Sequence, residues 1–107
     1  MLTQAQRQNI HDQAAEVSVI LKGGPHAKAV LANASPKLVR AISHMVMHGH
    51  AQGLIPHAHA QKHSAKIAKL RPGTSAATKA KTVQGGGFLG FLGPVLGGLA
   101  SAIFGHH

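Results

Sequence analysis

Histidine is the residue type in this chain best suited to bind a metal or to exchange protons near neutral pH, and the chain has ten. His44 and His48, like His59 and His63, are four residues apart, which places two imidazoles on one face of a helix. However, no cysteine and only two carboxylates could complete a metal site, and the excess of positive charge opposes a divalent cation. We therefore predict no metal and no other cofactor, and interpret the imidazoles as exposed or phosphate-facing groups that gain charge as the pH falls. A histidine-based metal carrier is the weakest of three functional alternatives.

The sequence contains none of the common catalytic patterns. There is no G-x-S-x-G around a serine nucleophile and no glycine-rich loop followed by Lys-Ser or Lys-Thr to bind a nucleotide phosphate. The two acids, Asp12 and Glu16, lie one turn apart near the start of an expected helix, where they interact favourably with the helix dipole. We therefore interpret them as exposed helix charges and predict that the protein is not an enzyme.

Lysine and arginine number 11, which gives the chain a formal net charge of +9 at pH 7. Such an excess attracts polyanions. No aromatic side chain stands among the cations to stack on bases, so the pattern favours contacts with phosphates that ignore base sequence and weaken with salt. We predict non-specific binding of a polyanion, with nucleic acid and anionic lipid as the two candidates. The predicted phosphate-binding residues are Lys37, Arg40, Lys62, Lys66, Lys69, Arg71, Lys79 and Lys81.

The C-terminal stretch, residues 85–105, contrasts with this basic body. It has no charged residue and holds all three aromatic side chains of the chain. Its length is close to the roughly 20 residues of a membrane-spanning helix, but eight glycines and a central proline argue against a smooth span. We predict that it contacts a membrane or a capsid protein through Phe88, Leu89, Phe91, Leu92, Val95, Leu96, Leu99, Ile103 and Phe104. The main alternative to DNA binding is therefore a membrane-active protein whose C-terminal segment inserts into bilayers, in a way that depends on pH.

The elements that must position these residues are expected to be helices, so the fold class is all-α. Thr3 and Gln6 form a capping-box pattern before an apolar stripe that ends near Leu21. A short alanine-rich helical segment is expected over 26–33, and Ser35-Pro36 then begins an amphipathic basic helix over 37–48. A further, weakly apolar helical segment is expected over 57–70. The predicted organisation is a basic helical region (1–70), a flexible basic linker (71–84) and a Gly-rich hydrophobic tail (85–107). With few large apolar residues, little independent core is expected.

Two stretches together resemble a known type of viral protein. They read SPKLVRAISHMVMHGHAQGLIP and, after a basic helix and linker, QGGGFLGFLGPVLGGL. Their order is similar to that of the small core proteins of adenoviruses (protein X, the precursor of mu) and of adenovirus-like polinton and adintovirus elements. The resemblance covers about residues 35–102, and its most specific part is residues 86–97.

The resemblance implies a minor virion protein that helps to condense packaged double-stranded DNA, located in the virion and in the host nucleus during assembly. It also implies cleavage by a viral protease after a Gly-Gly pair. The matching residues here are Gln84, Gly86, Gly87 and Phe88.

Overall fold

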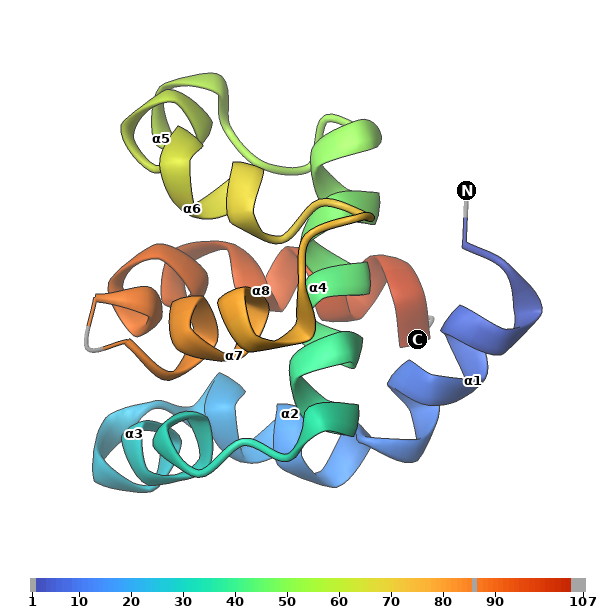
Figure 1. Ribbon diagram of the computed structural model, residues 1–107, viewed down its shortest axis with the longest axis vertical. Coiled ribbons are helices and arrows are strands. Elements are labelled where there is room, and N and C mark those ends of the chain that lie inside the picture. The colour runs from blue at the N-terminus through green and yellow to red at the C-terminus, as the bar shows by residue number, and fades with distance from the viewer. Residues whose placement is uncertain (1, 86, 105–107) are drawn as a thin grey trace.

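The computed structural model describes residues 2–85 and 87–104, which form α-helices joined by short turns (Figure 1). The described residues contain no strand, so the predicted all-α class is confirmed. The helices are α1 (Gln4–Asp12), α2 (Ala14–Lys22), α3 (Gly24–Ala32), α4 (Pro36–Ala51), α5 (His57–Lys62), α6 (Ser64–Lys69), α7 (Ala76–Gln84) and α8 (Phe88–Phe104).

The predicted capping box begins α1. The Thr3 hydroxyl accepts a hydrogen bond from the Gln6 amide at 3.1 Å, and the Gln6 side chain accepts one from the Thr3 amide at 2.9 Å. The sequence predicted one helix from this cap to Leu21, but the structure ends α1 at Asp12 and begins α2 after Gln13, whose ψ of 14° departs from helical geometry. This break turns α1 onto α4, whereas α2 packs on α3.

Helix α4 runs through the middle of the molecule, with the other helices arranged around it (Figure 1). The Ser35 hydroxyl caps it by accepting from the Leu38 amide at 3.2 Å, and Pro36 occupies the first turn, where a missing N–H costs nothing. The predicted apolar stripe, Leu38, Ile42 and Met45, is fully buried. Helix α4 therefore forms the centre of the core and turns its cationic side outward.

The region between α4 and α8 differs from the sequence prediction in two ways. The expected helical segment over 57–70 is two short helices, α5 and α6, divided at His63. The expected flexible linker over 71–84 contains a regular helix, α7, whose cap is Ser75: its hydroxyl accepts from the Thr78 amide at 3.2 Å. The prediction gave too little weight to this serine cap and to the alanines after it, which favour helix.

The core is more extensive than the sequence predicted, because the Gly-rich tail forms part of it. Helix α8 contacts α2, α3, α4 and α7, and its Phe88 and Phe91 are among the largest fully buried side chains. Burial of an aromatic side chain of this size contributes about 1.5–3 kcal/mol. At the crossing of α4 with α8, a methyl group on Gly49 would overlap the Leu99 side chain, so glycine permits the close approach.

Among the described residues, no single helix has both the length and the hydropathy needed to cross a bilayer. Helices α7 and α8 meet that test only as a pair, and they are bent by 91° at the break between them.

Candidate nucleic-acid interface

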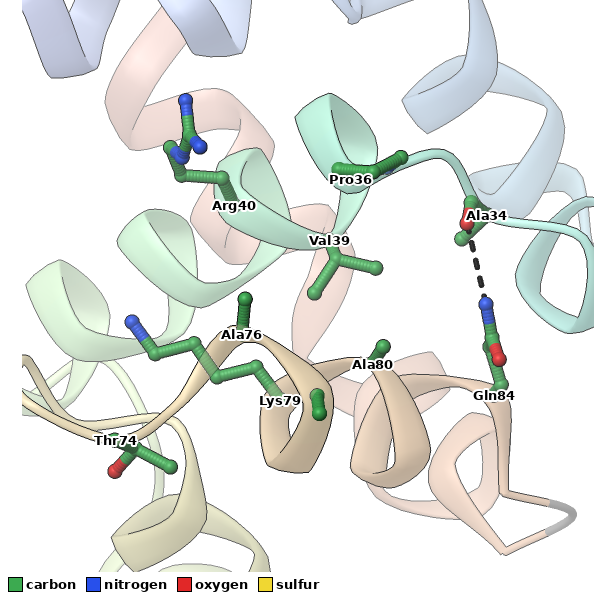
Figure 2. A pocket seen from close by; sticks show the side chains of 10 residues that line it. Ala34, Pro36, Val39, Arg40, Thr74, Ala76, Lys79, Ala80 and Gln84 are labelled. Atoms are coloured by element: carbon green, nitrogen blue, oxygen red, sulfur yellow. Dashed lines mark hydrogen bonds between the residues drawn. The ribbon is translucent and has the colours of Figure 1, made fainter.

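Arg40 and Lys79, two of the predicted phosphate-binding residues, are far apart in the sequence but line the same pocket between α4 and α7 (Figure 2). The pocket has a volume of about 430 Å³. The Ser35 cap begins α4, which carries Arg40, and the Ser75 cap begins α7, which carries Lys79. Packing of α7 on α4 thus brings two cations into the lining of one pocket, which sequence spacing did not indicate.

The electrostatic environment of this pair is positive. His44, one turn after Arg40 on α4, has a pKa below its ordinary value of 6.5, first because of burial and then because of the positive charges of Lys79 and Arg40. Neither Asp12 nor Glu16, both of which the structure describes, lines the pocket. The two cations therefore have no carboxylate beside them within the pocket lining, so an anion that enters the pocket meets no negative charge there.

The other predicted phosphate-binding residues lie outside this pocket lining. Most of them are exposed, whereas the half-buried Lys66 reaches toward the connection between α7 and α8, where Gly87 lies close to its ammonium end. The exposed residues are Lys37 on α4, Lys62 on α5, Lys69 on α6, Arg71 in the following turn and Lys81 on α7. The structure therefore gathers two of the predicted residues and distributes the rest over α4 to α7.

The residues predicted to contact a membrane or capsid are placed mainly inside the molecule. Phe88, Phe91, Leu92, Val95, Leu96, Leu99 and Ile103 are buried, and Leu89 and Phe104 are half-buried. Contact with a membrane or a capsid protein stays a prediction, whereas in this fold these residues contact other helices of the same chain. The physical reason is that α8 has one face of large side chains, and α2, α3 and α4 supply the apolar surface that this face requires.

The residues of the predicted protease site lie at the junction of α7 and α8. Gln84 ends α7, and its side-chain amide donates to the Ala34 carbonyl at 3.2 Å. Gly86 is outside the described residues, Gly87 is exposed, and Phe88 is fully buried with its amide donating to the Gly85 carbonyl at 3.1 Å. Because the residue after the predicted cut is part of the core, cleavage there requires local opening of this junction.

Two histidines take part in a cluster that the sequence did not reveal. The His59 ring stacks on Phe91 with centroids 5.4 Å apart, and its Nε2 lies 2.8 Å from the Phe91 carbonyl oxygen, to which its N–H can donate. The His63 ring lies 4.7 Å from that of His59 and 5.2 Å from that of Phe91. Periodicity placed the two histidines on one helix face but could not show that this face meets α8. Within the described residues, no three metal-binding side chains gather.

Comparison of the chain with protein-family models, curated protein sequences and solved structures gives no significant match. The resemblance to adenovirus core proteins stays a prediction, and the functional inference depends on charge, burial and geometry.

Proposed function

We propose that this protein binds double-stranded DNA non-specifically through phosphate contacts, as a minor virion core protein that helps to condense packaged DNA. The observation that carries the proposal is the presence of Arg40 and Lys79 in the lining of one pocket between α4 and α7, without a carboxylate in that lining. The chain has 11 basic residues and only two acidic ones, so this positive potential extends over the molecule. A polyanion is the partner that such a charge distribution attracts.

The burial of the aromatic side chains supports duplex rather than single-stranded DNA. Proteins that bind single strands stack bases on exposed aromatic rings. Here Phe88 and Phe91 are fully buried, and Phe104 is half-buried with its ring centroid 5.0 Å from that of His11 in a T-shaped arrangement. With no exposed phenylalanine among the described residues, binding depends on phosphates, which a duplex presents at high density.

The same proposal includes a location and a processing step. A protein that condenses packaged DNA resides in the virion and, during assembly of a virus of this type, in the host nucleus. Cleavage after Gly87 by a viral protease would separate α8 from the helices that bear the cations. The exposed Gly87 beside the half-buried Lys66 is the accessible part of this junction.

A salt titration of DNA affinity tests the proposal. We expect R40Q/K79Q to lower the affinity of a short duplex and to reduce the slope of log affinity against log salt by about two, because two phosphate contacts are lost. The matched control is K22Q/K28Q, which removes the same charge from exposed positions on α2 and α3. An equal loss in both variants would contradict a defined cationic face. Absence of binding by the unmodified protein at low salt would refute DNA binding altogether.

The second candidate is a membrane-active protein, which the uncharged sequence of α8 favours. Insertion would require α8 to leave the core and exchange its contacts with other helices for contacts with lipid. Leakage from anionic vesicles, measured at neutral and acidic pH with and without residues 85–107, separates the two candidates. Leakage that requires these residues and is unchanged by added DNA supports the membrane candidate.

A further inference from the structure

The pocket between α4 and α7 has two chemically different ends (Figure 2). At one end the lining holds the two cationic residues, Arg40 from α4 and Lys79 from α7, whose side chains extend in different directions. At the other end the hydrogen bond of 3.2 Å from Gln84 to the Ala34 carbonyl joins α7 to the segment before α4. The cationic end and the bridged end are thus separated by the body of the pocket.

The body of the pocket is apolar. Val39, which is only 4% exposed, points from α4 toward α7, and Ala76 and Ala80 point from α7 toward α4 (Figure 2). Pro36 and Ala77 complete this part of the lining. The volume of about 430 Å³ falls within the range of about 300–1,000 Å³ that is typical of small-molecule sites. A ligand that fills it removes apolar surface from water, and the same ligand needs a negative charge at only one end.

We propose that this pocket binds a single-chain anionic amphiphile, with its carboxylate or phosphate group at the end lined by Arg40 and Lys79 and its alkyl chain along Val39 and Ala80. A small inorganic anion would use the cations but leave the apolar body unfilled. A neutral amphiphile would fill the body but leave two cations without a partner. Only an amphiphile with an anionic end satisfies both parts of the pocket.

The proposal goes beyond DNA binding and does not depend on it. A duplex is too wide to enter a pocket of this volume, so phosphates would contact Arg40 and Lys79 from outside. The amphiphile and the DNA would therefore both contact Arg40 and Lys79, the amphiphile from within the pocket and the DNA from the outer surface. It follows that a bound amphiphile weakens DNA affinity by removing two phosphate contacts.

Decanoate, below its micelle-forming concentration, is a suitable probe, with decyl maltoside as the neutral amphiphile and acetate as the short anion. Backbone amide NMR shifts of the full chain report both position and affinity. We expect decanoate to shift the amides of Ala76, Ala77 and Ala80, and to bind at least about tenfold more tightly than either control compound, since each lacks one of the two interactions. Equal affinity for decyl maltoside, or for acetate, would overturn the proposal.

The substitution Ala77→Leu separates the pocket from the DNA-binding surface. Ala77 is exposed, lies on the pocket lining and sits in a helix that tolerates leucine, so the variant fills the pocket and keeps both cations. We expect A77L to lose decanoate affinity by about tenfold or more while it keeps the DNA salt slope of the unmodified protein. The matched control is A29L at an exposed position of α3, which should bind decanoate normally.

R40Q/K79Q should lower both affinities. Decanoate binding by A77L at the unmodified affinity would show that the ligand lies elsewhere and would overturn the proposal. Decanoate binding in the absence of DNA binding would leave the pocket standing and refute only the DNA-binding function.

Discussion

Helices α4 and α8 are similar in length and both contribute to the core, but they differ in what they present to solvent. The outer side of α4 has charged and titratable residues, among them Lys37, Arg40 and His50. The outer side of α8 has small or uncharged residues, namely Gly90, Gly93, Pro94, Gly97, Gly98, Ser101 and Ala102. Helix α4 is amphipathic in the usual sense, whereas α8 has an apolar buried face and an outer face of mostly small residues.

This difference teaches that the two helices are stabilised in different ways. Helix α4 has a side-chain cap, a proline in its first turn and an ordinary helix-forming sequence. Helix α8 has several interior glycines, each costing about 1 kcal/mol relative to alanine, and Pro94 removes one backbone hydrogen bond. Since intrinsic propensity opposes α8, the contacts of its buried face must hold it in helical form.

The largest effect is expected when a contact of that buried face is removed. Phe91→Ala leaves a cavity between α8 and the α5–α6 histidines and should lower the free energy of unfolding by about 3–5 kcal/mol. The measurement is urea-induced unfolding monitored by far-UV circular dichroism, which gives the loss in the free energy of unfolding. Phe104→Ala is the control: its ring is half-buried, so the loss should be smaller. A loss below about 1 kcal/mol for Phe91→Ala would mean that α8 does not belong to the core.

A second effect concerns the pH dependence of the stability that comes from the contact of the α5–α6 histidines with α8. Burial lowers the pKa of His63 below its ordinary value of 6.5, and repulsion from His59, and then from Lys66 and Lys62, lowers it further. Just below pH 6.5 the unfolded chain therefore binds more protons than the folded chain. The contribution of neutral His63 to the free energy of unfolding is complete above pH 6.5. It is lost as the pH falls through 6.5 toward the lower pKa of the folded state.

His63→Gln should therefore make stability less dependent on pH below neutrality. The measurement is the unfolding midpoint in urea at pH values from about 7.5 down to about 5. The control is His57→Gln, which changes an exposed histidine on α5. If the pH dependence of the His63 variant equals that of the control, the cluster with Phe91 contributes nothing to it.

The smallest effect is expected on the outer side of α8 and has the opposite sign. A methyl group added at Gly98 would meet nothing within 4 Å, so Gly98→Ala should stabilise the protein by about 0.5–1 kcal/mol through helix propensity. The thermal unfolding midpoint should rise. Gly49→Ala is the informative contrast on α4, because its methyl group would overlap Leu99 and should lower the midpoint. A fall in the midpoint for Gly98→Ala would show that this side of α8 is not exposed.

Local sequence signals predicted several elements of the fold correctly. The Thr3 capping box and the Ser35-Pro36 start were recognisable because a cap involves residues only three positions apart. The stripe of Leu38, Ile42 and Met45 was recognisable from helical periodicity. The Ser75 cap of α7 had the same kind of signal, but its basic, polar surroundings were interpreted as a linker.

The candidate site was predicted only in part, because its geometry depends on contacts between distant segments. The charges of Arg40 and Lys79 could be found in the sequence, whereas their common pocket could not. The same holds for His59 and His63, whose spacing was visible while their contact with Phe91 was not. Spacing along one helix carries no information about which other helix will face it.

The sequence by itself determined the helical class, the excess of positive charge and the separation of charged from uncharged segments, because these follow from composition and from interactions within a few residues. Only the tertiary structure decided where the apolar segment finds its partner. A run of phenylalanine, leucine and glycine is equally compatible with lipid, another protein or the interior of its own chain, since hydrophobic burial has no preferred direction. Here α2, α3, α4 and α7 surround the buried face of α8, and their packing also brings together the two cations of the proposed site.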